Sequence, residues 1–389
     1  MNNRERVLAI LNYENYDRLP LVHFGFWRET LQKWAAEGHI SAGVAENWQD
    51  GTSLRHDAPE AVINAKLGFD LNWYNCFSPV TRLWPAIEEQ ILEESPDGTQ
   101  KVLNSDGAVV IQKVGLTSIP TEVDHLLKGR QEWEAFFLPR LRFCEERITR
   151  ADVNTGLDVL PFTAGGLEFL RRGAWDNPYG LNCGSLYGVV RNWLGLVGTA
   201  YLQKDDPKLF DEIIQTVGEL CYQCAKRVLD AGARFDFGHF WEDICFKSGP
   251  LINPRVFRDK VGPFYRRITD LLRDHGINIV SLDCDGKIDA LLPIWLEHGV
   301  NTMFPIEVGT WHASIEPWRA QYGRELRGVG GMDKRVFAQD YRAVDAEVER
   351  LKPLVDLGGF IPCPDHRIPA DAKWANVQYY CDRMRQTFG

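Results

Sequence analysis

Short apolar segments alternate with amphipathic stretches along the chain from about residue 155 onward. The apolar segments occupy residues 158–163, 180–185, 235–241, 277–282, 302–308, 326–332 and 358–363. Stretches with a helical hydrophobic period follow most of these segments, among them 254–274, 288–298 and 338–355. Strands that alternate with helices in this way predict right-handed βαβ units and a parallel sheet.

The N-terminal part of the chain adds further predicted strands. Residues 19–27 are typical of a buried strand, and 67–75 supply another, which brings the total to about eight. This number favours a closed (β/α)8 barrel of the TIM type over an open sheet. The chain has neither a GxGxxG nor a Walker motif, which weakens the case for a nucleotide-binding open sheet.

Two other N-terminal features predict additions to the barrel. Residues 3–13 indicate a short amphipathic helix, and 88–113 indicate a β-meander whose turns fall at two Asp-Gly dipeptides. We therefore expect an α/β protein with one barrel domain over residues 1–389. That domain would carry an N-terminal extension and a small β-meander insertion at 88–114.

Composition and charge narrow the function classes. The 389 residues are 44% hydrophobic and 25% charged, which suits a large barrel, and the net charge of −10 argues against nucleic-acid binding. No apolar run is long enough to predict a membrane span, and no apolar segment follows the N-terminus as in a signal peptide. The nine dispersed cysteines predict free thiols in a cytoplasmic protein.

Acidic and histidine residues recur where the predicted strands end, which is where barrel enzymes place their active sites. Burying a carboxylate is costly unless it is paired, so an active site explains this recurrence better than helix capping alone. Asp333 and Asp365 could each instead be the N-cap of the following helix. The residues at these strand ends are Glu242, Asp283, Asp285, Glu307, Asp333 and His366.

Asp283 and Asp285 are two positions apart, so both point to one side if the strand continues through them. Two carboxylates that share a site raise the pKa of one of them, which can supply a general acid. Alternatively, they bind zinc or another divalent metal with His366 as the third ligand. A further possibility is that His366 only caps a helix or orients a ligand. We predict that these three residues converge and, with Glu242, form the catalytic group.

Other residues near the strand ends are candidates for substrate contacts. His23 lies on the first strand, and Tyr187 lies in a glycine-rich exit from the 180–185 segment. A glycine-rich exit lets a flat ligand approach, on which Tyr187 and Trp311 could stack. Packing at the barrel rim is the alternative role for these aromatic side chains. The full predicted substrate-binding set is His23, Asn182, Tyr187, Glu307, Trp311 and Asp333.

Several motifs together resemble the uroporphyrinogen decarboxylase superfamily, and within it the branch related to cobalamin-dependent methyltransferases. They are residues 4–11 with 17–20, 249–257, 330–334, 358–361 and 365–369, in this order over nearly the whole chain. The resemblance implies a (β/α)8 barrel. It also implies transfer of a methyl group between a corrinoid and an acceptor such as a thiol or a reduced folate.

This chain departs from two patterns of the superfamily. Thiol-methylating members bind zinc through a His-x-Cys-Gly segment and a later Cys before Ile-Pro. The matching positions here are Asp283, Asp285 and His366. An oxygen and nitrogen metal site, or acid–base catalysis without metal, is therefore expected. Uroporphyrinogen decarboxylases grip their substrate with N-terminal arginines, but residues 20–34 contain only Arg28.

The expected function is thus a methyltransferase with a small-molecule methyl acceptor. The chain lacks the Asp-x-His-x-x-Gly signature of corrinoid-binding domains, so the cobalamin would be carried by a separate corrinoid protein. Two alternatives remain: a decarboxylase or lyase that acts on another acid, and a barrel that binds a tetrapyrrole or corrinoid without turnover. The oligomeric state is left open by the sequence.

Overall fold

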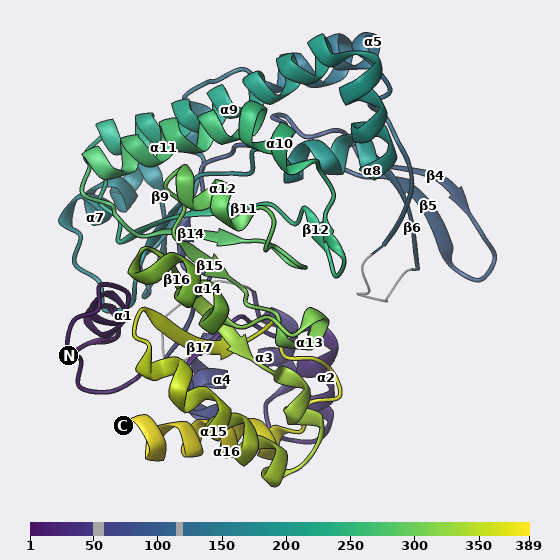
Figure 1. Cartoon of the computed structure of the whole chain (residues 1–389). Coiled ribbons are helices and arrows are strands. Elements are labelled where there is room, and N and C mark those ends of the chain that lie inside the picture. Colours follow the sequence, from purple (N-terminus) through teal and green to yellow (C-terminus); the bar gives the residue numbers. More distant parts are fainter. Residues whose placement is uncertain (50–57, 114–119) are drawn as a thin grey trace.

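The computed structural model describes residues 1–49, 58–113 and 120–389 and is built around a parallel sheet (Figure 1). Seven strands follow the order β17-β16-β15-β14-β11-β10-β3. Their bounds are β3 Cys76–Phe77, β10 Gly180–Asn182, β11 Phe237–Trp241, β14 Val280–Asp283, β15 Thr302–Phe304, β16 Arg327–Met332 and β17 Phe360–Pro364. Every pairing between these neighbours is parallel.

The sheet closes on itself through the N-terminal strands. β1 (Val22–His23) pairs in parallel with β2 (Leu71–Asn72), and only three residues separate β2 from β3. On the other side of β1, Phe26 forms a parallel bridge with Ile368, just beyond β17. With β2 and β3 counted as one bent strand, the described residues form the eight positions of a (β/α)8 barrel. The predicted fold class is therefore confirmed.

Long helices surround the barrel (Figure 1). α9 (Pro207–Asp230) shows why the sequence forms them: the side chain of Asp206 accepts a hydrogen bond from the Leu209 amide, and Pro207 occupies the first turn. Its buried residues recur every three or four positions, which places them on one face against the core. The other long helices are α8 Gly188–Asp205, α11 Gly262–Asp274, α14 Ile315–Tyr322, α15 Tyr341–Asp356 and α16 Trp374–Phe388.

α1 (Asn3–Leu11) precedes β1 and forms the N-terminal extension, and the described residues between β1 and β2 form α2 (Arg28–Ala36), α3 (Ala42–Asn47) and α4 (Pro59–Leu67). α1 begins with a capping box, in which the Asn2 side chain and the Glu5 side chain each bind the other residue's backbone amide. The remaining short helices are α5 Arg130–Glu132, α6 Glu146–Thr149, α7 Leu167–Arg172, α10 Pro254–Val256, α12 Leu292–Glu297 and α13 Val308–Trp311.

A four-stranded antiparallel sheet occupies the region in which the meander was predicted. It comprises β4 (Gln90–Glu94), β5 (Thr99–Leu103), β6 (Ala108–Lys113) and β7 (Thr121–His125). The first three strands and their turns lie where the sequence indicates. β7 lies beyond the predicted boundary, whose last residue, Val114, is outside the described residues.

One predicted strand does not belong to the barrel. Within 158–163 only β9 (Val159–Pro161) is extended, and it pairs antiparallel with β8 (Asp152–Asn154) in a separate two-stranded sheet. Leu157 and Val159 are exposed, so this apolar run is not buried on two faces as a barrel strand would be. The other short strands, β12 (Cys245–Phe246) and β13 (Gly249–Pro250), form a hairpin after β11.

The structure also bears on the expectations about membrane spans and cysteines. Among the described helices, none is both long and apolar enough to cross a membrane. All nine cysteines are free thiols in the structure, and Cys221 and Cys224 are buried core residues of α9.

Candidate active site at the mouth of the barrel

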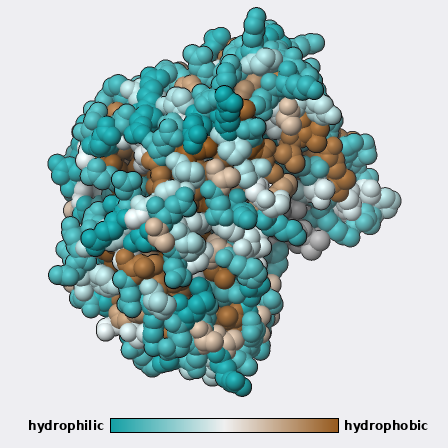
Figure 2. All heavy atoms as spheres, in the orientation of Figure 1, coloured by the Kyte–Doolittle hydropathy of each residue, from teal (hydrophilic) through white to brown (hydrophobic). Residues whose placement is uncertain are grey.

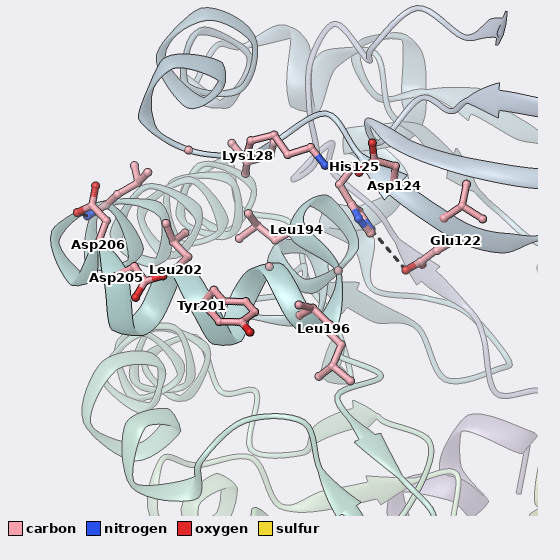
Figure 3. Close-up of a pocket in the computed structure, with 17 residues that line it drawn as sticks. Glu122, Asp124, His125, Lys128, Leu194, Leu196, Tyr201, Leu202, Asp205 and Asp206 are labelled. Atoms are coloured by element: carbon pink, nitrogen blue, oxygen red, sulfur yellow. Dashed lines mark hydrogen bonds and ion pairs between the residues drawn. The ribbon is translucent and has the colours of Figure 1, made fainter.

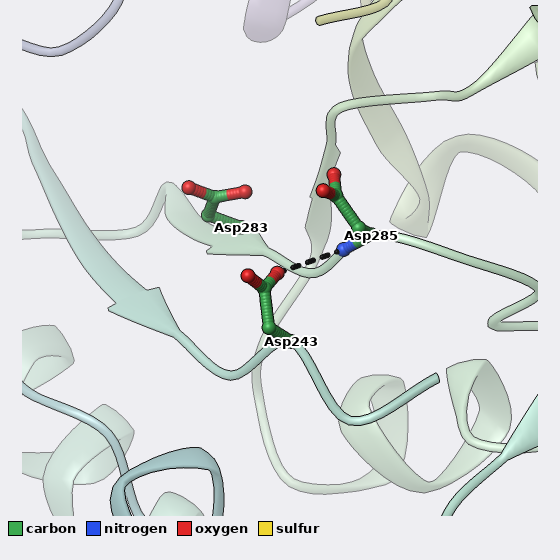
Figure 4. Close-up of side chains that lie close together, drawn as sticks. All are labelled: Asp243, Asp283 and Asp285. Atoms are coloured by element: carbon green, nitrogen blue, oxygen red, sulfur yellow. Dashed lines mark hydrogen bonds between the residues drawn. The ribbon is translucent and has the colours of Figure 1, made fainter. Parts of the chain in front are cut away.

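Three aspartates cluster where β11 and β14 end. Asp243 follows β11, while Asp283 is the last residue of β14 and Asp285 lies just beyond it. One carboxylate oxygen from each residue lies within 4.8 Å of the corresponding oxygens of the other two (Figure 4). The backbone amide of Asp285 also donates a 3.1 Å hydrogen bond to the carboxylate of Asp243. The sequence prediction for this site included Asp283 and Asp285 but not Asp243.

The backbone of Asp243 adopts a left-handed conformation, with φ of 45°. This region is uncommon for residues other than glycine, and such conformations concentrate at functional sites. Because the chain turns here, Asp243 leaves the alternation of the strand and joins the cluster. Strand periodicity in the sequence could not reveal this positive φ, so it could not predict that Asp243 joins the site.

Burial and mutual repulsion raise the proton affinity of two of these acids. The pKa of Asp243 is raised to about 7 by its burial and by the nearby charge of Asp285. The pKa of Asp283 is raised well above its ordinary value by burial and by the charges of Asp243 and Asp285. Both acids therefore hold their protons to a higher pH than an ordinary aspartate does, and Asp243 titrates near neutral pH.

Tyr74 holds Asp283 from the opposite side of the barrel mouth. Its hydroxyl donates a 2.6 Å hydrogen bond to Oδ2 of Asp283. The Tyr74 ring stacks on Phe24 with 5.5 Å between the centroids and meets the ring of His239 edge-on at 5.2 Å. Tyr74 was not among the predicted site residues, because in the sequence it is one aromatic residue within the strand predicted at 67–75.

His366 reaches the cluster from the segment after β17. Its Nε2 lies 3.5 Å from Oδ2 of Asp285. The imidazole stacks on Trp27 at 5.5 Å and meets Phe24 edge-on at 5.3 Å. The structure thus brings Asp283, Asp285 and His366 into one site, as their strand positions indicated. His366 lies beside the carboxylate cluster as a partner of Asp285, and Asp243 completes the group that could hold a metal.

Glu242, predicted to be catalytic, instead anchors the loop after β10. It is fully buried, and its carboxylate accepts hydrogen bonds from the backbone amides of Leu186, Tyr187 and Gly188. The hydroxyls of Ser185 and Tyr265 also donate to it. These bonds occupy its oxygens within the protein, so we correct its role to a structural one.

His23 also lies away from the site. Its side chain is completely buried, with Nε2 3.0 Å from Glu60 of α4 and Nδ1 accepting a hydrogen bond from the Gly25 amide. The neighbouring residue Phe24 faces the site instead, through its contacts with Tyr74 and His366. Successive side chains of a strand point to opposite faces, so a difference of one position decides which residue lines the mouth.

Two more predicted substrate contacts support the barrel loops. Tyr187 is 2% exposed and packs edge-on against Phe210 and Phe257 in the core. Glu307 accepts hydrogen bonds from the Gly286 amide and the Thr310 hydroxyl. It therefore fixes the turn that follows Asp285.

The other three predicted contacts also have local roles. Asp333 caps a short helical turn by accepting a hydrogen bond from the Arg335 amide and pairs with the guanidinium of the same residue. Trp311 lines a separate cavity of about 370 Å³ with Trp318. The carboxamide of Asn182 accepts a hydrogen bond from the Gly184 amide, at the end of β10.

A cavity of about 710 Å³ lies elsewhere, between β7 and α8 (Figure 3). Its lining includes Glu122 and His125, whose side chains are 3.5 Å apart, and Tyr201. None of the predicted site residues lines it. Figure 2 shows apolar surface where α8 meets the small sheet, and α8 carries the exposed residues Leu196 and Val197.

Comparison with known proteins supports the fold. Residues 196–387 match the family model described as uroporphyrinogen decarboxylase (URO-D). A methyltransferase from Methanosarcina mazei superposes with a TM-score of 0.59 at 15% identity, over 100% of this chain and 99% of that one. A B12-independent methionine synthase from a Shewanella species gives a TM-score of 0.37 at 13% identity, over 59% and 69% of the two chains. A search of curated protein sequences finds no match.

Proposed function

The C-terminal half of this chain belongs to the uroporphyrinogen decarboxylase superfamily, and we propose that the protein is an enzyme that transfers a methyl group between a corrinoid and a small acceptor. The observation that carries the proposal is the cluster of Asp243, Asp283 and Asp285 at the mouth of the barrel. Superfamily members are enzymes, and the fold extends over the whole length of a methyltransferase. The acceptor would be a thiol or a reduced folate.

The three carboxylates fit a borderline or hard divalent cation such as zinc or magnesium. Oxygens that share such an ion bind it at about 2.0–2.6 Å and so lie at most about 5 Å apart. The oxygens of Asp243, Asp283 and Asp285 lie within 4.8 Å of one another. A cation there would also relieve the repulsion that raises the pKa of Asp243 and of Asp283. When bound, the metal would supply Lewis acidity to the heteroatom of the acceptor.

In the protein without metal, the same residues are suited to proton transfer. Burial raises the pKa of Asp283, and Tyr74 donates to its Oδ2, so a proton on the other oxygen would be donated to the acceptor. Asp243, with a pKa of about 7, accepts the proton that the acceptor loses as its heteroatom takes the methyl group. His366 orients Asp285 from the other side.

The methyl carrier would arrive on a separate corrinoid protein. Flat aromatic groups border the mouth on the side of His366, where Trp27 stacks on its imidazole and Arg367 lies 5.6 Å over the Trp27 ring. Such a surface suits a planar macrocycle. A bound corrinoid would supply the methyl group as an electrophile and keep the electron pair of the broken cobalt–carbon bond, while the side chains of this chain bind and deprotonate the acceptor.

Decarboxylation is the second candidate, and one observation favours it. The positive charges of Arg191 and Arg367 act on Asp243 and on Asp283 respectively and lower their proton affinities. Cations beside the cluster could hold the carboxylate of a substrate, and a protonated acid could return a proton to the carbon that loses carbon dioxide. This reading predicts carbon dioxide release with no change in a corrinoid spectrum.

The test of the proposal combines metal analysis with a methyl-transfer assay. The purified protein is assayed with methylcobalamin and a panel of thiols and reduced folates, and the corrinoid absorbance is followed. We expect demethylation with at least one acceptor and a loss of about 100-fold or more in Asp243→Asn and Asp285→Asn. Asp274→Asn, at an exposed aspartate of α11, is the matched control and should retain full activity.

The proposal would be contradicted if the folded wild-type protein failed to demethylate methylcobalamin with every acceptor in the panel. The decarboxylase reading would then be tested on carboxylic acids by carbon dioxide release.

A further inference from the structure

A layer of polar side chains crosses the interior of the barrel one step below the acidic cluster. Asn182 pairs in register with His239, His239 with Ser281, and Ser281 with Thr302, on four neighbouring strands. In a parallel sheet, residues in register point to the same face. Ser281 lies two positions before Asp283 on β14, so this face is the one that carries the acid. Layers inside such barrels are usually built of Val, Ile and Leu.

Two members of this layer have no hydrogen-bond partner among the described residues. His239 is 1% exposed, and neither of its ring nitrogens has a partner among the described residues. Ser281 is fully buried, and its hydroxyl is also unpaired within the described part of the chain. Buried polar groups are nearly always satisfied, and leaving one without a partner is unfavourable. Two unsatisfied groups side by side therefore indicate that something else binds them.

The surroundings of His239 define what that ligand can be. Its ring contacts Tyr74, Phe237 and Phe304, and no carboxylate or cation is paired with it in the described structure. Burial lowers the pKa of His239 to about 4, so the imidazole is neutral and offers one donor and one acceptor. The acidic cluster lies directly above, which disfavours an anion. An uncharged group with its own donor and acceptor matches these properties.

We infer that His239 and Ser281 form a binding subsite for an uncharged amide or hydroxyl group. On the proposed function, on which this assignment of the ligand rests, that group belongs to the methyl acceptor. Tyr74 joins the two parts of the site, since its ring touches His239 and its hydroxyl binds Asp283. A group held by His239 and Ser281 would thus place the rest of the acceptor against the aspartates.

The binding test uses a pair of probes with one shape and different charge, acetamide and acetate. Histidine ring nitrogens are labelled with 15N in the full-length protein, and their signals are followed by NMR as each probe is added. We expect acetamide, and not acetate, to shift the His239 signals. In the variants, acetamide binding is measured by the rise in Tm that acetamide causes. His239→Leu and Ser281→Ala should each weaken this binding by about 3- to 10-fold, the effect of a lost neutral hydrogen bond. His239→Gln, which keeps a donor and an acceptor, should restore part of the binding.

Thermal stability separates a binding residue from a structural one. Because no described residue satisfies the ring nitrogens of His239, His239→Leu should raise Tm while it weakens binding. A lower Tm in His239→Leu, or equal shifts with acetate and acetamide, would overturn the inference and identify a core histidine that holds trapped water. The binding test needs no methyl transfer. An inactive wild-type protein that binds acetamide would therefore contradict the proposed function and leave the subsite intact.

Discussion

The Tyr74 hydroxyl donates a hydrogen bond of 2.6 Å to Oδ2 of Asp283, which is 209 residues away in the sequence. Tyr74 lies between β2 and β3, and Asp283 ends β14. These strands are not neighbours in the sheet, so the bond spans the mouth of the barrel. The irregular N-terminal part of the chain therefore contributes directly to the acidic site.

Replacing Tyr74 by Phe should reduce activity with little change in stability. The bond from Tyr74 lowers the proton affinity of Asp283, so its loss raises the pKa of that carboxyl further and frees its position. We expect kcat to fall by about 10- to 100-fold. The ring contact with Phe24 is kept in the variant, so Tm should remain within about 2 °C of the wild type. Methylcobalamin assays and thermal unfolding measure the two effects. An unchanged kcat would show that Asp283 acts without this bond.

Stability should depend on pH through Asp243. The folded protein binds this proton more tightly than the unfolded chain, because the pKa rises from 3.8 to about 7 on folding. The resulting stabilisation is present below pH 4 and is lost as the pH rises through about 7. Asp243→Asn should therefore be more stable than the wild type at pH 8, by on the order of 2 kcal/mol. Urea unfolding at pH 5 and at pH 8 measures this difference. Parallel pH profiles in the two proteins would contradict the assignment.

A divalent cation should restore the stability that the folded protein loses as the pH rises through about 7. An ion that binds only the folded protein stabilises it by about 2.7 kcal/mol at a concentration 100 times its Kd. Zinc or magnesium added at pH 8 should therefore raise the Tm of the wild type by several degrees and leave that of Asp243→Asn and Asp285→Asn nearly unchanged. Asp274→Asn, remote from the cluster, should respond as the wild type does. Equal stabilisation of all four proteins would show that the ion binds elsewhere.

The sequence predicted the barrel because its strands are nearly continuous apolar runs that alternate with periodic helices. β17 and β16, for example, lie within the segments expected at 358–363 and 326–332, apart from the last residue of β17. The 158–163 segment has similar composition but lies outside the barrel. An apolar run predicts an extended segment, whereas its strand partners depend on contacts with residues far away in the sequence.

The sequence predicted the site residues that follow strand alternation and missed those whose position depends on a local turn or on strand register. Asp283 and Asp285 follow regular strand alternation, so their positions could be worked out. Asp243 enters the cluster through a positive φ, and Glu242 beside it turns inward to bind backbone amides. His23 and Phe24 exchange roles because strand β1 is only two residues long and composition alone does not set its register.

Exchanging one carboxylate oxygen of Glu242 for an amide NH2 group should destabilise the fold. One of its oxygens accepts from Leu186 and Tyr265, and the other accepts from Ser185, Tyr187 and Gly188. In Glu242→Gln an amide NH2 replaces one of these oxygens. That group would face at least two donors and could accept from none of them. We expect the free energy of unfolding to fall by about 2–4 kcal/mol.

Activity in this variant should follow the folded fraction, since Glu242 supports the start of α8 and does not contact the acceptor. At 10 °C, where the protein remains folded, kcat should stay within about 3-fold of the wild type. Urea unfolding and the methylcobalamin assay at that temperature measure the two quantities, with Glu14→Gln, at an exposed glutamate, as the control. A large loss of kcat in a variant of unchanged stability would return Glu242 to the catalytic group. A stable, active variant would mean that the loop after β10 does not need this carboxylate.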